Sequence, residues 1–200
     1  MVACRKQRRD GGIMKTKHIV LLIGLLIYAS STAAQTRFYD VTRTFHESGF
    51  TYQADVSPAG GVVLYNRANH FTNLVQIAQE RRFRDGRRIS EADREIDDVI
   101  SENWTRPLAR NIVRDAFSAT ERSRLRQGEQ LGVIMIICSD TGNVREVLFE
   151  FWRDSGYATI PVSTWRRIEL ELKRQIQFTP TAHGRSMNFL FWGWHIDASQ

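Results

Sequence analysis

The middle of the chain carries two apolar runs on either side of a short polar break, in the stretch LGVIMIICSDTGNVREVLFEFW at residues 131–152. Nearly every residue of the first run is apolar, which is typical of a strand buried on both faces. The break at 140–143 contains Gly142, and the β-branched residues around it favour a hairpin. Apolar and polar residues alternate in the second run. We therefore expect one packed face and one solvated face, the latter carrying Glu146 and Glu150.

After the hairpin, the spacing of apolar residues changes to that of a helix and then back to that of a strand. Between residues 159 and 178 the apolar residues form a single helical stripe, made of Trp165, Ile168, Leu172 and Ile176. The segment MNFLFWGWHI at 187–196 alternates and predicts a last strand beside the hairpin. One face of that strand would carry Phe189, Phe191, Gly193 and His195, and the other Leu190, Trp192, Trp194 and Ile196.

The first half of the chain is expected to contain strands and then helices. Residues 37–66 alternate as strands do, with a turn at Glu47-Ser48-Gly49. The charged stretch 79–88 is the best internal boundary. A capping pattern at Ser90 predicts a helix with its inner face on Ile96, Val99, Ile100 and Trp104. A second helix should begin near Thr105, with Leu108, Ile112, Val113, Ala116 and Phe117 on its inner side.

These elements predict an α+β fold, an antiparallel sheet with two or three helices. The expected organisation is an N-terminal β-rich region at residues 35–87, followed at 88–200 by a helical segment and a β-β-α-β unit.

Charge and hydropathy set residues 1–34 apart from the rest. They hold six of the 28 basic residues and one of the 22 acidic ones, so the remaining chain is nearly neutral. A basic stretch from Met14, an apolar run and small residues up to Ala34 follow the layout of a secretory signal peptide, with residues 1–13 as an upstream extension. The apolar run is too short to span a membrane. We therefore expect cleavage, no stable anchor, and export to the periplasm or outside a Gram-negative cell.

The composition argues against nucleic-acid binding and against an intrachain disulfide. The near neutrality after residue 34 removes the electrostatic argument for a nucleic-acid partner. Cys138 is the single cysteine of that part of the chain, so no intrachain disulfide is expected.

Three motifs in order resemble the C-terminal domain of TonB, the periplasmic energy-coupling protein. Gly142 in the hairpin is followed by Val144 and Val147, the helix is followed by Phe178-Thr179-Pro180, and Gly184-Arg185 precedes the last strand. The resemblance covers about residues 129–196. It implies two helices against an antiparallel sheet, and a non-catalytic unit that binds partner segments by strand pairing.

The chain also departs from the TonB pattern. It has four prolines in all, so a long proline-rich spacer is absent, and residues 35–87 have no counterpart. Energy coupling is therefore not expected. Over its whole length the chain is similar to a family of secreted Bacteroidetes proteins of about 200 residues, which implies no particular activity.

Histidine and cysteine give little support for catalysis. The histidines after residue 34 (His46, His70, His183 and His195) do not show the His-x-x-x-His spacing of a zinc site, so no metal or cofactor is expected. Cys138 closes an apolar strand, where thiols are usually inert. Its pairing with His183 or His195 is the hypothesis of a catalytic cysteine.

The two glutamates of the hairpin do not suit glycoside hydrolysis. At about 3.3 Å per residue, Glu146 and Glu150 lie roughly 13 Å apart along one strand. A glycosidase pair is separated by at most about 9.5 Å. We interpret them as acids on the wet face of the sheet.

Large rings on both faces of the last strand point to recognition. Only one face can lie beneath the helix, so the other must be covered by the N-terminal region, another chain, or a ligand such as a sugar or peptide. The predicted binding residues are Arg185, Phe189, Phe191, Trp192, Trp194 and His195.

The sequence thus predicts an exported, non-catalytic domain that binds a protein, a peptide or a glycan of the cell envelope through its terminal strand. The alternatives are a small secreted enzyme acting on cell wall or glycan with His183 or His195, and a self-associating structural protein.

Overall fold

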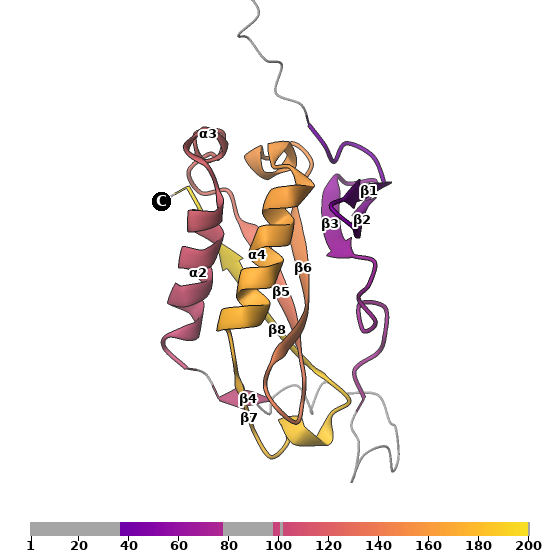
Figure 1. Cartoon of the computed structure of the whole chain (residues 1–200), viewed down its shortest axis with the longest axis vertical. Coiled ribbons are helices and arrows are strands. Elements are labelled where there is room, and N and C mark those ends of the chain that lie inside the picture. Colours follow the sequence, from indigo (N-terminus) through magenta and orange to yellow (C-terminus); the bar gives the residue numbers. More distant parts are fainter. Residues whose placement is uncertain (1–36, 78–97, 101, 200) are drawn as a thin grey trace, which may run out of the picture. The chain divides into compact units, whose positions relative to one another are not determined.

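The computed structural model describes residues 37–77, 98–100 and 102–199 (Figure 1). The predicted signal peptide, the charged stretch 79–88 and the predicted helix start at Ser90 lie outside these residues. None of the helices in the described ranges is long and apolar enough to cross a membrane.

Six strands form one sheet, in the order β1-β2-β3-β6-β5-β8. Every neighbouring pair is antiparallel. The predicted hairpin supplies the neighbouring interior strands β6 and β5, and the predicted last strand is the edge strand β8 beside β5. The strands are β1 Arg43–Glu47, β2 Phe50–Val56, β3 Gly61–Asn66, β5 Leu131–Ile137, β6 Val144–Trp152 and β8 Leu190–Ile196.

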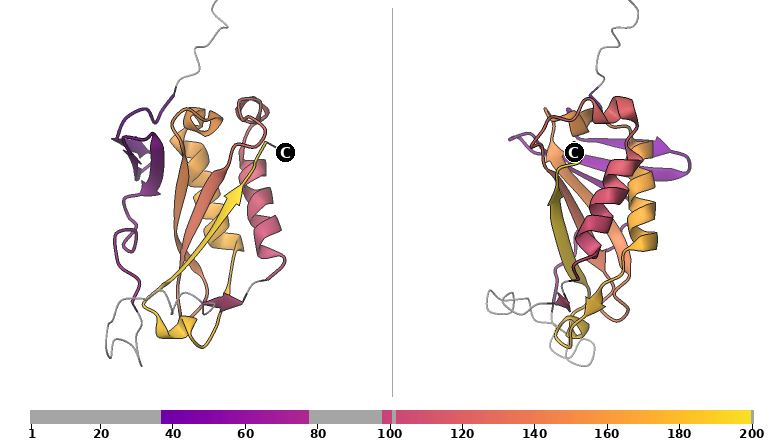
Figure 2. Two further views of the ribbon diagram at one scale, coloured as in Figure 1. Left: turned by 180° about the vertical axis from the view of Figure 1, so that it is seen from behind. Right: turned by 90° about the vertical axis from the view of Figure 1, so that its left-hand side faces the viewer.

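Three α-helices of the described residues complete the α+β fold: α2 Thr105–Ala116, α3 Ala119–Arg122 and α4 Val162–Gln175. The long helices α2 and α4 lie side by side on one face of the part of the sheet made by β5, β6 and β8 (Figures 1 and 2). The short helix α3 is stabilised by a capping box between Ser118 and Glu121. Two short 3-10 helices, η2 Gly156–Thr159 and η3 Gly184–Ser186, precede α4 and β8.

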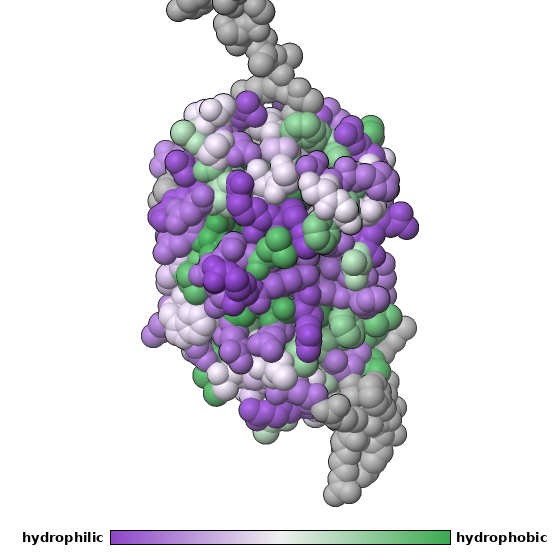
Figure 3. Space-filling model, in the orientation of Figure 1, coloured by the Kyte–Doolittle hydropathy of each residue, from purple (hydrophilic) through white to green (hydrophobic). Residues whose placement is uncertain are grey.

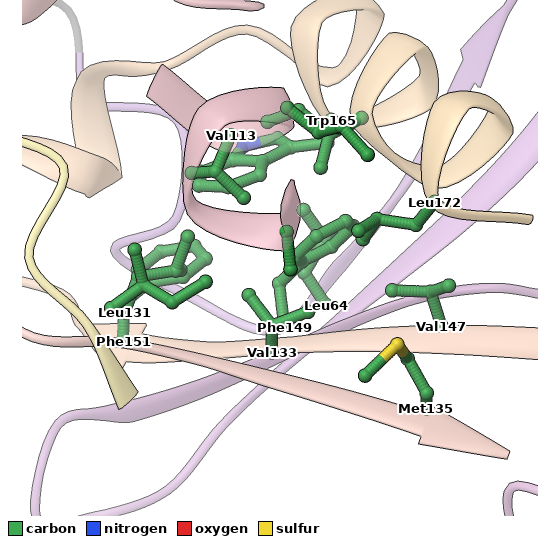
Figure 4. Packing of buried hydrophobic residues seen from close by; sticks show 14 of the residues in the cluster. Leu64, Val113, Leu131, Val133, Met135, Val147, Phe149, Phe151, Trp165 and Leu172 are labelled. Carbon is green, nitrogen blue, oxygen red and sulfur yellow. The ribbon is translucent and has the colours of Figure 1, made fainter. Parts of the chain in front are cut away.

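The predicted helical stripe forms the centre of the core. Trp165 is fully buried, and its indole ring stacks on Phe151 with ring centroids 5.3 Å apart. Its N–H donates to the carbonyl oxygen of Ile160 at 3.2 Å, which satisfies the polar end of the ring. Ile168 and Leu172 are also fully buried, and Val113 brings α2 into the same cluster (Figure 4).

One predicted helix is wrong where the structure describes it. Val99–Ile100 form the two-residue strand β4, which pairs with β7 Thr179–Pro180. Val99 is buried, whereas Ile100 and Trp104 are about half exposed, at 52% and 46%. The three residues therefore do not share an inner helical face. Trp104 instead precedes the first turn of α2.

The second face of the hairpin is not the wet face that was predicted. Residues 67–77, which follow β3, cover the part of this face that carries Glu146 and Leu148, so both residues are buried. The Glu146 carboxylate accepts hydrogen bonds from the backbone N–H groups of His70 and Phe71 and from the Thr72 hydroxyl. A buried carboxylate is stable there because these donors replace its water.

Candidate functional site

The predicted binding residues lie on and just before β8, whose full length pairs with β5. Leu190 lies opposite Ile137 at one end of the strand, and Ile196 lies opposite Leu131 at the other. The start of β8 is fixed by residues 75–77. The Asn188 N–H donates to the Ile77 carbonyl oxygen at 3.2 Å, and the Gln76 side chain donates to the Phe189 carbonyl oxygen at 3.0 Å.

Trp192 and Trp194 occupy the helix side of β8, and both are half-buried. Their rings pack on Phe178, which follows α4, with ring centroids 6.0 and 5.9 Å away. The indole N–H of Trp192 is buried, and no acceptor for it exists among the residues that the structure describes. These two rings lie at the margin of the core, so only part of each ring is accessible to a ligand.

The opposite side of β8 carries the exposed residues. Phe191 is 40% exposed, and Gly193 and His195 are exposed as well. Phe189, another predicted binding residue, is only 1% exposed and packs on Phe71 with ring centroids 5.2 Å apart, so its ring is not available on the surface of the strand. Arg185 is exposed on η3, ahead of the strand.

The two edges of the sheet differ in charge. The edge strand β1, with the sequence RTFHE, carries Arg43 and Glu47. The edge strand β8, LFWGWHI, has no Asp, Glu, Lys, Arg or Pro. Charged residues and proline are the usual devices that stop an edge strand from pairing with another chain. Within the described ranges no strand pairs with the outer edge of β8, so its outward backbone groups remain open to a further strand.

The structure does not join the candidate catalytic residues of the sequence. His183 precedes β8, whereas His195 lies near the far end of that strand. The six steps from Phe189 to His195 alone span roughly 20 Å along an extended chain. The His183 imidazole lies 3.6 Å from an Asp98 carboxylate oxygen, at the β4–β7 end of the molecule. Cys138 is half-buried after β5, level with the start of β8 rather than with His195.

His195 does face an acid and a ring across the sheet. His195 lies opposite Gly132, which lies opposite Glu150. Since glycine has no side chain, a hollow of about 510 Å³ opens here, and Trp152, 57% exposed, forms part of its wall. Sequence spacing could not reveal this group, because it depends on the register of three strands.

A second cavity, of about 570 Å³, contains residues that sequence reasoning did not combine. Cys138 and His70 both line it, together with Glu146 and residues of α4. Burial raises the pKa of the Cys138 thiol, but hydrogen bonds from Thr141, Asp140 and Arg145 outweigh it and hold that pKa below its usual range. The lining comes from separate parts of the chain, so no local motif marks it.

No group of three or more His, Cys, Asp or Glu side chains within the described residues could hold a metal ion. The candidate sites are therefore built from rings, backbone edges and isolated charged groups.

Comparison with known proteins places the chain in a family. No match is found among curated proteins. A DUF5043 family protein from Bacteroides uniformis, known from a crystal structure, is similar with a TM-score of 0.70 and 29% sequence identity over 80% of this chain and 87% of that chain. The family model described as domain of unknown function (DUF5043) matches residues 35–194. The chain therefore belongs to the DUF5043 family.

Proposed function

We propose that this protein is an exported, non-catalytic binding domain that takes up an extended, largely apolar segment of an envelope protein along the outer edge of β8. The observation that carries the proposal is that this edge bears no Asp, Glu, Lys or Arg and pairs with no strand of the described residues. An incoming strand would gain backbone hydrogen bonds from the edge and side-chain contacts with Phe191 and His195.

Gly193 gives further support. A Cβ atom built at this position would meet its nearest neighbours, in Ile134 and Val133, at 3.6 Å, which is ordinary contact. Nothing in the described structure therefore requires glycine, although glycine weakens a strand. Close approach of a partner accounts for it. The buried Trp192 N–H without an acceptor, next to the same edge, is a second group that a partner could satisfy.

The order of elements also supports the proposal. β5, β6, α4 and β8 follow one another as hairpin, helix and strand, and β8 returns beside β5. The sequence resemblance to the TonB C-terminal domain implies a unit of this kind, and in TonB that unit binds partner segments by strand pairing. The predicted signal peptide would bring the domain to the compartment where such partners reside.

The test uses short peptides selected from a random library on the wild-type protein. We predict that Phe191→Lys weakens the selected peptides at least about tenfold, because a charge on an edge strand opposes pairing. The matched control is Leu170→Lys, which places the same charge on α4 at a residue of similar exposure, 46% against 40%. Equal affinity for both variants would refute edge binding.

A second candidate function is a glycan-directed enzyme, favoured by the hollow that combines Glu150, His195 and Trp152. Release of sugar fragments from purified cell wall by the wild type, and not by Glu150→Gln, would replace the binding proposal.

Self-association is the third candidate, since two copies of β8 could pair with each other. Sedimentation of the protein distinguishes it. A dimer that Phe191→Lys converts to a monomer would identify a second copy as the occupant of the edge.

A further inference from the structure

The 570 Å³ cavity opens where β3 leaves β6. Pairing between these strands ends at Tyr65 and Leu148, whereas β6 extends back to Val144. β1–β3 run at a steep angle to β5 and β8 (Figure 2). The walls are formed by Phe50, by residues 66 and 68–71, by α4, by the ends of β5 and β6 nearest their turn, and by residues 188–189 before β8. A volume of this size is typical of small-molecule sites.

Both carboxylates in the cavity wall are already neutralised or hydrogen-bonded. Glu146 is held by the donors of residues 70–72. Glu169 has no exposed surface and forms ion pairs with Lys173 and, at 3.0 Å, with Arg166. It also accepts a hydrogen bond from the Tyr52 hydroxyl. Neither carboxylate is therefore expected to bind a cationic ligand.

The basic side chains of the wall are only partly neutralised by acidic ones. Three basic residues, Arg145, Arg166 and Lys173, face two acids, so the wall carries one excess positive charge. Arg145 is exposed. The Nε–H of Arg166 is buried and finds no acceptor within the described ranges, although Arg166 otherwise pairs with Glu169 and stacks over the Phe50 ring at 3.4 Å. A buried donor without an acceptor is costly, and an anionic ligand could remove that cost.

The rest of the lining is largely apolar. Phe71 and Phe189 pack on each other, and Ile136 joins them in a small cluster separate from the main core. On the face that α4 covers, hydrophilic residues surround separate hydrophobic patches (Figure 3). The cavity thus combines a basic rim with a floor of rings.

We propose that this cavity binds a small molecule made of one anionic group, such as a carboxylate, and an apolar body. The anionic group pairs with the basic side chains of the rim, and the body rests on the phenylalanine floor. Arginine suits this role because its planar donors match the oxygens of carboxylates and related anions. The site is separate from the outer edge of β8 and does not depend on the proposed peptide binding.

The first probe is 8-anilino-1-naphthalenesulfonate, an aromatic body with one anionic group, and its uncharged counterpart N-phenyl-1-naphthylamine is the matched ligand. We expect Arg145→Gln and Lys173→Gln each to weaken the sulfonate probe roughly tenfold, as loss of one charge-assisted hydrogen bond does. The uncharged probe should change little. Arg110→Gln, at an exposed position of α2, is the matched protein control.

A second variant removes the space instead of the charge. Ala68 is exposed and lines the cavity, so Ala68→Trp should fill its mouth and abolish binding of both probes. Ala182→Trp, at an exposed position that does not line the cavity, should have no effect. Circular dichroism of each variant separates loss of the site from loss of the fold.

Cys138 reports occupancy at the site itself. Dodecanoate should slow alkylation of Cys138 by iodoacetamide, followed by mass spectrometry of the peptide that contains it, and dodecan-1-ol should slow it much less. Unchanged probe affinity in Arg145→Gln, Lys173→Gln and Ala68→Trp, with Cys138 equally reactive in the presence of dodecanoate, would overturn the proposal.

Discussion

Glu169 is a fully buried acid whose surroundings keep it charged. Burial disfavours the carboxylate, but Lys173, Tyr52 and Arg166 outweigh that effect and hold the pKa of Glu169 below its usual range. The donors come from α4 itself and from β2, so the carboxylate joins the helix to the N-terminal strands. Removal of one member of a buried ion pair leaves the other charge uncompensated. The resulting loss of folding free energy exceeds the net contribution of the intact pair.

We predict that Glu169→Gln lowers the free energy of unfolding at pH 7 by about 3 kcal/mol, because Arg166 and Lys173 lose their countercharge. The folded-state pKa is depressed, so the stabilisation is present above the ordinary value of 4.5 and is lost as pH falls through the lower folded value. The difference in unfolding free energy between Glu169→Gln and the wild type should therefore become smaller at acidic pH. Urea unfolding at pH 7 and pH 3.5 measures it.

The control is Glu171→Gln, which removes the exposed partner of Arg174 on the same helix. Its effect should be small, since exposed ion pairs contribute little. A loss in Glu169→Gln that is equal at both pH values would contradict the role given to the charge.

The local sequence pattern predicted which face of a strand a residue occupies, but not whether that face is buried. Alternation placed Phe189 and Phe191 on one face correctly, but it could not show that Phe71 covers the first ring and leaves the second exposed. Glu146 was assigned to solvent for the same reason. Burial on that face depends on residues 67–77, whose path is set by tertiary contacts.

The β5–β6 hairpin is fixed to the segment after α4 through its turn. Gly142 has φ +75°, and its carbonyl oxygen accepts from the Phe178 N–H at 2.9 Å. A Cβ atom at this position would lie 1.7 Å from the Phe178 carbonyl oxygen. The turn therefore needs glycine twice, for its backbone conformation and for the close approach of another segment.

We predict that Gly142→Ala destabilises the protein more than Gly49→Ala does. Gly49 in the β1–β2 turn has φ +82° and no atom within 4 Å of an added Cβ, so it measures the conformational effect alone. That effect is about 1 kcal/mol, and the clash at Gly142 should add about 1–3 kcal/mol. Thermal unfolding of both variants gives the comparison. Equal losses would show that the turn can move away from Phe178.

At the scale of elements, strong periodicity predicted the structure well. The hairpin, the stripe of α4 and the alternation of β8 each carry a pattern over seven or more residues. β4 has two residues, and its conformation comes from pairing with Thr179–Pro180 rather than from its own sequence. A pattern read as helix over Val99–Ile100 failed because the pairing partner is distant in the chain.

At the scale of the whole molecule, the sheet joins the N-terminal strands to the C-terminal unit. β3 pairs with β6, and the core cluster includes residues of β2, β3, β5 and β6 as well as both long helices. Sequence patterns predicted the strands of both regions but not this pairing, since the residues between them carry no signal of register. The cavity and the hollow both depend on it, which explains why neither could be predicted.

The two edges of the sheet differ in how they are protected against pairing with another strand. β1 is protected by charge, whereas β8 has no Asp, Glu, Lys or Arg and no strand on its outer edge in the part of the chain that the structure describes. The matched family region runs to residue 194 and so includes residues 190–194 of β8.

Hydrogen–deuterium exchange of β8, with and without a selected peptide, tests edge binding most directly. In the free protein the amides of residues 190–196 that point away from β5 should exchange fast, and bound peptide should protect alternate amides along the strand. Protection of β8 amides by the peptide, lost in Phe191→Lys and kept in Leu170→Lys, is the expected result. Tight peptide binding that leaves β8 exchange unchanged would contradict it.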